Sequence, residues 1–202
     1  MKGPGLVTIR HAPVARAWRG TCYGVSDVPT EVTAARAADA METALGAGEP
    51  SFDVVWSSDL VRCAGPAAEL VARGRAADHR EDVRLRELDH GAFEGRTWEE
   101  LHDHATEALA HWGCSWETAG PPGGESAREL ERRVAAWARE LDPGSRHLLV
   151  AHAGVQRSLL VSTGEVDWPR AMQVDLPHLT LRGVELAALD TSGARSRDSK
   201  SR

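Results

Sequence analysis

Two histidines occupy equivalent places in the sequence, each just beyond a short apolar run. His11 comes after the run 6–9 and Arg10, and His152 comes directly after the run 147–151. If both runs are strands of an open α/β sheet, their carboxyl ends meet at the edge where such sheets bind ligands. Imidazoles act there as nucleophiles, as acids and bases, or as metal ligands. The pattern therefore predicts one crevice that holds both histidines.

Two arginines and a helix start are expected at the same edge. Arg10 precedes the first histidine, and Arg62 falls in the first turn of a helix whose N-cap is expected from residues 57–59. A second helix is expected to begin near Gly154, where its free N–H groups would point into the crevice. Guanidinium groups bind phosphoryl oxygens with charge-assisted hydrogen bonds of roughly 1.5–3 kcal/mol each. The set favours a phosphorylated ligand.

A carboxylate in the turn-rich segment 85–95 gives the crevice an acid. Glu87 could donate a proton there if a desolvated site raises its pKa towards neutrality. An alternative uses the same side chains differently, because two histidines and a carboxylate also form metal sites. Arg10 next to His11 disfavours a metal ion, since a neighbouring cation lowers the affinity for another. Sensitivity to a chelator separates the two mechanisms.

These side chains need a sheet to bring them together, and the hydrophobic pattern predicts one. Short apolar runs, each of the length of a strand buried on both faces, cover 6–9, 53–56 and 147–151. Ala-rich segments with apolar residues at helical spacing cover 31–47, 60–73 and 126–141. Strands that alternate with helices indicate an α/β protein, here a three-layer α/β/α sandwich with a mostly parallel central sheet.

The expected organisation is a single domain over residues 1–190. Within it, the segment 97–122 is rich in Trp, His and Glu and is expected to form an inserted helical lid over the edge of the sheet. A hairpin is expected over 176–189, and its apolar strands could pair across a two-fold axis to form a homodimer. Residues 191–202 are too polar to pack, which predicts a disordered tail.

Composition narrows the class of protein. The 202 residues carry 24 basic and 30 acidic side chains and a net charge of −6, which argues against a surface that coats nucleic acid. No stretch approaches the ~20 apolar residues of a membrane-spanning helix, and the N-terminal residues do not resemble a signal peptide, so a cytoplasmic protein is expected. The cysteines are widely spaced and indicate neither a disulfide framework nor a zinc site.

Several short motifs follow one another in the chain between residues 6 and 160. They are Arg10-His11-Ala12, Ser57-Ser58-Asp59-Leu60-x-Arg62, Leu85-x-Glu87-Leu88-x-x-Gly91-x-x-Glu94-Gly95, Gly123-Gly124-Glu125-Ser126 and His152-Ala153-Gly154-Val155. As an ordered set they resemble the histidine phosphatase superfamily, which includes cofactor-dependent phosphoglycerate mutases and α-ribazole phosphatases. The resemblance implies the α/β fold of that family and a phosphatase-type enzyme.

The resemblance also implies roles for individual residues. His11 is the nucleophile, Arg10, Arg62 and His152 form the phosphate pocket, His152 takes part in catalysis, and Glu87 is the proton donor. A phosphohistidine divides one hard displacement into two easier ones, while the arginines and a protonated His152 neutralise the equatorial oxygens. Glu87 then protonates the departing alkoxide and deprotonates the attacking water. This route requires no metal and no cofactor.

Further positions are expected near the pocket without a catalytic role. In the family the Gly-Gly-Glu-Ser motif lies close to the active site, so Ser126 is expected as a neighbour, while Glu125 suits the start of the following helix. Ala153 and Arg16 are other candidate neighbours, Arg16 because its segment offers no other side chain to touch the phosphate. Family members usually have Gly after the first histidine, where this chain has Ala12.

Three functions remain open from the sequence. The leading expectation is a phosphomonoesterase for a small phosphorylated metabolite. The run 20–29 is similar to one in α-ribazole phosphatases, which makes α-ribazole 5′-phosphate a candidate substrate. A phosphoglycerate mutase is less favoured, because residues 97–126 contain no Lys or Arg to hold a bisphosphate and offer tryptophans on which a ring could stack. A non-catalytic phosphate-binding protein is the third alternative.

Overall fold

A five-stranded sheet forms the centre of the computed structural model, which describes residues 5–46 and 52–186. In spatial order the strands are β3 (Ala76–Glu81), β2 (Phe52–Ser57), β4 (His147–Ala151), β1 (Leu6–Arg10) and β5 (Leu181–Val184). The first four are parallel and β5 runs antiparallel to β1. The predicted mostly parallel sheet is confirmed, and the three strands expected from apolar runs are its three inner members.

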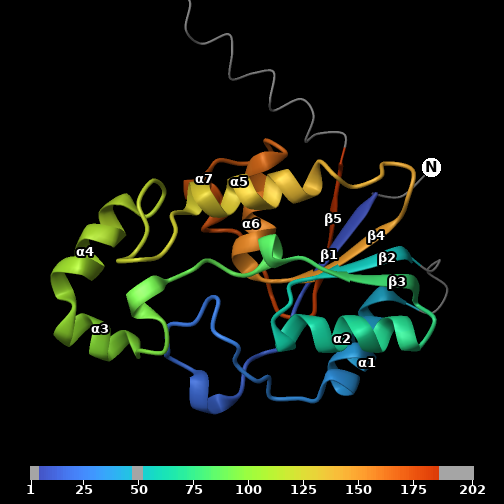
Figure 1. The fold of residues 1–202 in the computed structure, drawn as a ribbon, viewed down its shortest axis with the longest axis horizontal. Helices are drawn as coiled ribbons and strands as arrows, with labels where there is room; N and C mark the ends of the chain where they lie inside the picture. The colour runs from blue at the N-terminus through green and yellow to red at the C-terminus, as the bar shows by residue number, and fades with distance from the viewer. Residues whose placement is uncertain (1–4, 47–51, 187–202) are drawn as a thin grey trace, which may run out of the picture.

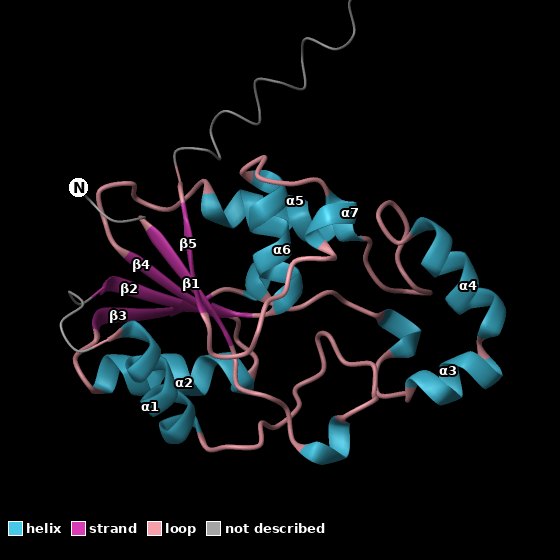
Figure 2. Cartoon of the chain, turned by 180° about the vertical axis from the view of Figure 1, so that it is seen from behind, coloured by secondary structure: helices cyan, strands magenta, loops and turns pink. Residues whose placement is uncertain are grey.

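Helices cover both faces of this sheet (Figure 1 and Figure 2). On one face lie α1 (Ala34–Leu45) and α2 (Val61–Ala72), and on the other lie α5 (Ala127–Ala138) and α6 (Ala153–Ser162). The predicted three-layer α/β/α sandwich is therefore confirmed. Beyond the carboxyl ends of the parallel strands lie α3 (Trp98–His104) and α4 (Thr106–Ser115), while α7 (Trp168–Ala171) follows α6. The short 3₁₀ helices are η1 (Arg16–Trp18), η2 (Val83–Leu85) and η3 (Gly91–Phe93).

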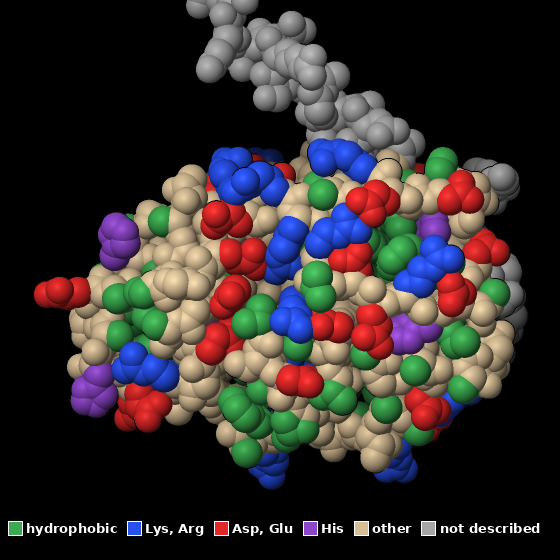
Figure 3. Space-filling model, viewed as in Figure 1, with side chains coloured by type: hydrophobic (Ala, Val, Ile, Leu, Met, Phe, Trp, Pro, Cys, Tyr) green, Lys and Arg blue, Asp and Glu red, His purple; other side chains and the backbone are tan. Residues whose placement is uncertain are grey.

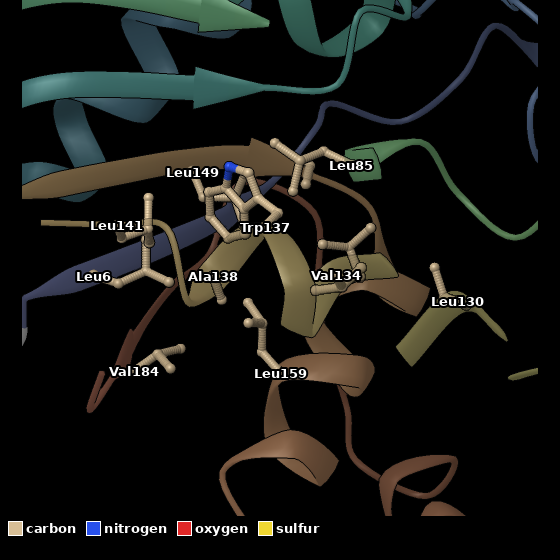
Figure 4. Packing of buried hydrophobic residues seen from close by; sticks show 12 residues of the cluster. Leu6, Leu85, Leu130, Val134, Trp137, Ala138, Leu141, Leu149, Leu159 and Val184 are labelled. Carbon is tan, nitrogen blue, oxygen red and sulfur yellow. The ribbon is translucent and has the colours of Figure 1, made fainter. Parts of the chain in front are cut away.

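Two apolar clusters hold the layers together, one on each face of the sheet. Between the sheet and the helices α5 and α6, Trp137 of α5 is completely buried among residues such as Val134, Leu149 and Leu159 (Figure 4). Trp56 on the sheet meets Trp137 edge-on, with ring centroids 5.7 Å apart. The second cluster joins the sheet to α1 and α2 and includes Ile9, Met41, Val55, Leu70 and Leu148. Truncating one such side chain to Ala typically costs about 2–5 kcal/mol.

Basic and acidic side chains are intermixed over the face that Figure 3 shows. Arg84, for example, pairs with both Asp82 and Glu140, with N···O distances of 2.7 and 2.6 Å. Surface ion pairs are typically worth about 0–1 kcal/mol each, so they balance charge more than they stabilise the fold. Within residues 5–46 and 52–186, no helix combines the length and apolar character needed to cross a bilayer.

The hairpin predicted over 176–189 does not form. Leu181–Val184 is one continuous strand that runs through Arg182 and Gly183, where the sequence predicts the turn. The chain turns earlier, at Leu179, which adopts a left-handed φ of 58°. The prediction of a homodimer was based on this hairpin, so the described residues do not support it. Residues 187–189 of that prediction, the predicted tail and the C-terminal limit of the predicted domain lie outside the described residues.

The start of α2 also differs from the prediction. Leu60 is its N-cap residue and provides no side-chain cap. The Ser58 hydroxyl accepts from the N–H of Leu60 over 3.2 Å but from no N–H of the helix itself. Instead the backbone N–H of Val61 donates to Asp27 Oδ1 over 2.8 Å. Asp27 belongs to the loop that precedes α1, so this hydrogen bond ties that loop to the helix turn that carries Arg62. The predicted position of Arg62 in the first turn is correct.

Candidate active site

His11 and His152 lie side by side at the carboxyl edge of the sheet. Arg10 of β1 is in register with Ala151 of β4, so the next residue of each strand is a histidine. The backbone N–H of His11 donates to the carbonyl of Ala151 over 3.0 Å, and the two imidazole centroids are 5.1 Å apart. Both residues are buried, with 3% and 0% of their surface exposed. The crevice expected from the two strand ends is present.

The ring of His11 is oriented by the residue that follows it. Its Nδ1 lies 2.6 Å from the carbonyl oxygen of Ala12. Because a carbonyl only accepts, Nδ1 carries the proton and Nε2 keeps its lone pair. Burial, followed by the positive charge of Arg62, lowers the pKa of His11 well below its ordinary value. The imidazole is therefore neutral at neutral pH, which is the nucleophilic form.

The segment 176–179 holds Arg10 and His11 in place through hydrogen bonds, a contact that the sequence did not predict. His178 Nδ1–H donates to the carbonyl of His11 over 2.6 Å, and the N–H of Leu179 donates to the carbonyl of Arg10 over 2.9 Å. The Arg10 guanidinium donates in turn to the carbonyl of Leu176 over 2.9 Å. Burial, then the charge of Arg10, lowers the pKa of His178. The sequence showed only an apolar run around this histidine.

Arg62 reaches the crevice from α2 and is 1% exposed. Its Nη1 donates to the carbonyl of Ser26 over 2.7 Å and its Nη2 to the carbonyl of Gly24 over 2.6 Å. The Nε–H groups of Arg62 and Arg10 are buried, and neither has a hydrogen-bond partner within the described residues. An unpaired buried N–H typically costs about 1–3 kcal/mol. An anion that accepts hydrogen bonds from these two N–H groups would remove this energetic cost.

The loop that holds Arg62 is organised by Glu94. The Glu94 carboxylate accepts from the backbone N–H groups of residues 24–26 over 3.0, 3.2 and 3.1 Å, and His90 Nδ1 lies 3.5 Å from it. Burial opposes the charge, but hydrogen bonds from His90 and from residues 24–26 hold the pKa of Glu94 well below its usual range. The carboxylate therefore positions Arg62 through the backbone. The sequence motif contained Glu94, but nothing in it indicated this role.

Glu87 lies at the N-terminus of α6. Its carboxylate accepts from the N–H groups of Gly154 over 3.1 Å and Leu88 over 3.0 Å. A Cβ at Gly154 would lie 2.1 Å from Glu87 Oε1, so a larger residue there would displace this carboxylate. Arg133 of α5 donates to the carbonyl of Glu87 over 2.9 Å and pairs with Glu125, so both support the segment that carries Glu87. Glu125 is thus a structural partner rather than a simple helix-start residue.

His152 is the N-cap residue of α6 and is completely buried. Burial, then the charge of Arg62, lowers the pKa of His152 well below its ordinary value. The sequence predicts a protonated His152 in contact with phosphate; without a ligand, the imidazole is neutral at neutral pH. A phosphoryl dianion in contact with it would raise the pKa again, because an opposite charge favours the protonated form.

One cavity of about 590 Å³ joins these groups, a size that suits a small ligand. Its inner end, next to the sheet, is lined by Arg10, His11, Arg62, Glu87 and His152. Its outer end, away from the sheet, is lined by Trp98, Trp112, Trp116, Trp168, Pro169 and Met172. Three of these tryptophans belong to the segment 97–122, which the sequence predicts to be a lid.

Three candidate neighbours from the sequence do not line this cavity. Arg16 is exposed on η1. Ser126 caps α5, where its backbone N–H donates to Glu129 over 2.8 Å. Ala153 is buried at the start of α6, and Gly154 lines the cavity instead. Among residues 5–46 and 52–186, no group of three or more His, Cys, Asp or Glu side chains is arranged to hold a metal ion.

Known proteins share both the sequence pattern and the fold. The family model described as the histidine phosphatase superfamily (branch 1) matches residues 6–192. A probable phosphoglycerate mutase of Salmonella choleraesuis is 37% identical over 158 residues, covering 77% of this chain and 72% of the relative. The α-ribazole phosphatase of Shigella flexneri superposes with a TM-score of 0.75 at 22% identity, covering 89% of this chain and 95% of that one. A mycobacterial glucosyl-3-phosphoglycerate phosphatase superposes with a TM-score of 0.71 at 26% identity, covering 86% and 85%.

The chain belongs to the histidine phosphatase superfamily, because the family model covers most of its length. The resemblance expected from the sequence motifs is confirmed, and so is the expectation of a phosphatase-type enzyme. The similarity to the α-ribazole phosphatase, at 22% identity, establishes the fold alone. The relatives carry names of different activities, so the substrate depends on this chain's own residues.

Proposed function

We propose that the protein is a phosphomonoesterase that hydrolyses a small phosphorylated metabolite through a phosphohistidine at His11. One observation carries the proposal: the buried Nε–H groups of Arg10 and Arg62 have no partner within the described residues, and both arginines line the same end of the cavity as the neutral imidazole of His11. A phosphoryl group supplies the acceptors that the arginines lack and the electrophile that His11 needs.

In the first step, His11 Nε2 attacks the phosphorus atom in line with the ester bond. The N–P bond forms, and the P–O bond breaks with its electron pair moving to the ester oxygen. Arg10, Arg62 and the N–H of His152 stabilise the charge on the three equatorial oxygens. Glu87, in its protonated form, donates its proton to the departing alkoxide. The products of this step are a free alcohol and a phosphohistidine.

In the second step, the Glu87 carboxylate takes a proton from water. The water oxygen attacks phosphorus, the N–P bond breaks, and the electron pair returns to His11 Nε2. Inorganic phosphate leaves and Glu87 holds the proton needed for the next turnover. The hydrogen bonds from Gly154 and Leu88 keep the carboxylate in place for both transfers.

The choice between hydrolysis and mutase-type transfer depends on the outer end of the cavity. A mutase must retain a highly charged bisphosphate while it reorients. The segment from Thr97 to Ser126 offers no Lys or Arg for this purpose, which favours hydrolysis even though similar sequences are named probable phosphoglycerate mutases. Within the proposal, α-ribazole 5′-phosphate is a candidate substrate, supported by the run 20–29.

The test is hydrolysis of p-nitrophenyl phosphate by the wild type and His11→Ala, each with and without EDTA. The proposal predicts turnover that resists EDTA and is lost in His11→Ala, with circular dichroism confirming that the variant folds. Loss of wild-type turnover in EDTA would instead support the metal mechanism. Binding of inorganic phosphate without turnover of this ester or of any alkyl phosphate would support the non-catalytic alternative.

A further inference from the structure

The outer end of the cavity is built from indole rings. Trp98 on α3 and Trp112 on α4 stack with ring planes 6° apart and centroids 6.5 Å apart. Trp116 and Trp168 form a second pair, which meets edge-on with centroids 6.0 Å apart. All four rings line the same cavity as His11. They give its outer end large, flat and apolar surfaces.

Few cations border this end of the cavity. His90 contacts the first tryptophan pair and lies 3.5 Å from the carboxylate of Glu94. Arg157 lines the cavity, but its Nε donates to the carbonyl of Ala171 over 3.0 Å. The sequence from Thr97 to Ser126 supplies no further Lys or Arg. Tryptophans rather than cations therefore make up most of the outer end, which suits an uncharged leaving group better than one with a carboxylate or a second phosphate.

Two polar atoms of the residues that line this end lack a hydrogen-bond partner within the described residues, His90 Nδ1 and Trp112 Nε1. The Nε1–H of Trp112 is buried and has no hydrogen-bond partner within the described residues. By contrast, the Nε1–H of Trp168 donates to Glu131 over 2.8 Å. Buried indole N–H groups usually find an acceptor. Trp137 in the core lacks one among the described residues as well, so the unpaired group bears on a ligand only at Trp112, which lines the cavity. A nitrogen or oxygen atom at the edge of a planar ring has the required geometry.

We infer that the substrate is the phosphate ester of a neutral alcohol that carries a flat aromatic ring. The inference rests on the proposed phosphatase function, in which the phosphoryl group occupies the inner end of the cavity while the ring lies among the tryptophans. Ring contacts act on the bound substrate and on the transition state alike, so they lower KM more than they raise kcat. The tryptophans are thus specificity residues rather than catalytic residues.

The test compares primary alkyl esters that share the same reacting atoms: 2-phenylethyl, 2-cyclohexylethyl and n-butyl phosphate, with 3-phosphoglycerate as the anionic comparison. The phenyl and cyclohexyl esters differ in flatness but hardly in size. We expect kcat/KM for the 2-phenylethyl ester to exceed that of each of the other three by about tenfold. Trp112→Leu and Trp116→Leu should each reduce the phenyl-to-butyl ratio about three- to fivefold through KM.

Trp18→Leu is the matched control, because Trp18 lies on η1 and does not line the cavity. Its ratio of kcat/KM for the 2-phenylethyl and n-butyl esters should equal that of the wild type. Equal kcat/KM for the phenyl and cyclohexyl esters, or a preference for 3-phosphoglycerate, would overturn the aromatic inference and leave the phosphatase function intact. Turnover of p-nitrophenyl phosphate without turnover of any alkyl ester would overturn it as well. Failure to hydrolyse any ester would count against the phosphatase function itself.

Discussion

The inner and outer ends of the cavity are held in place by different means. At the inner end, main-chain groups fix the side chains: the carbonyls of Gly24 and Ser26 hold Arg62, and the carbonyl of Ala12 orients His11. At the outer end, ring contacts and packing on apolar side chains hold the tryptophans. Phosphoryl transfer needs charges at fixed distances, which the backbone provides, whereas selection of a leaving group needs only a surface of suitable shape.

The two ends also rest on different apolar clusters. The strands behind the inner end belong to the two large clusters of the sandwich. α3 and α4 instead pack on a small cluster around Cys22, Phe93 and Leu101. Substitutions at the inner end should therefore reduce turnover of every substrate by a similar factor. Substitutions at the outer end should change the preference among substrates.

Arg62→Ala is expected to have the largest effect of the inner-end variants other than those of His11 itself. It removes a buried guanidinium charge from the equatorial oxygens, and we expect kcat/KM to fall by about 10²–10³ for p-nitrophenyl, 2-phenylethyl and n-butyl phosphate alike. Arg62→Lys should recover little, because an ammonium group cannot reach both carbonyls and the phosphate in fork geometry. Steady-state kinetics with the three esters check the prediction. A change in the ratio of kcat/KM for the 2-phenylethyl and n-butyl esters would contradict the idea that the inner end acts on all substrates alike.

His178 should matter for kcat although it does not line the cavity. His178→Ala leaves the buried carbonyl of His11 without its donor, and we expect kcat to fall about 10- to 50-fold, in line with the cost of ~1–3 kcal/mol for an unsatisfied polar group. His178→Asn is the matched variant, because its side-chain amide can donate from nearly the same position. If His178→Asn restores most of kcat and KM is unchanged in both variants, then His178 acts by positioning His11. Equal loss in both variants would argue against it.

Glu94→Gln tests whether the Glu94 carboxylate holds Arg62 in place through the loop of residues 24–26. We expect it to reduce the free energy of unfolding by about 2–3 kcal/mol, since charge-assisted bonds from residues 24–26 are lost, and to raise KM several-fold. The stabilisation from the lowered pKa of Glu94 is complete above the ordinary value of 4.5 and is lost as pH falls below it. The stability difference between wild type and variant should therefore shrink in acid, which denaturant titrations at several pH values would measure.

The buried histidines should make the stability of the fold depend on pH. Burial lowers the pKa of His11, His152 and His178, so the unfolded chain binds protons near the ordinary value of 6.5 that the folded chain does not. The free energy of unfolding should fall as pH drops below that value, by up to ~1.4 kcal/mol per pH unit for each histidine. His178→Asn should show a shallower slope. An unchanged slope would mean that His178 titrates alike in both states.

The sequence predicted those parts of the fold and site that depend on local pattern. Apolar runs located β1, β2 and β4, and the residues directly after β1 and β4 are the paired histidines. β3 was harder to locate, because Asp78, His79 and Arg80 interrupt any apolar run. The polar residues reflect its place at the edge of the sheet, where only one neighbouring strand pairs with it.

Contacts between distant segments were not predictable from spacing. The cap of α2 comes from Asp27, and the clamp on the His11 backbone comes from His178, 167 positions away in the sequence. The predicted hairpin failed because Gly183 lies within β5 rather than in a turn, while the turn occurs at Leu179, a residue type that rarely adopts positive φ. Neither feature leaves a local signal in the sequence.

The central claim is that phosphate passes through His11, and the most direct measurement is to trap it there. The enzyme is mixed with ³²P-labelled ester, quenched in base within one turnover, digested, and its peptides are analysed by mass spectrometry. We predict base-stable, acid-labile label on the peptide that contains His11, and none in His11→Asn, which keeps a side chain of similar shape. Continued hydrolysis without any labelled histidine, or with label on another residue, would contradict the mechanism.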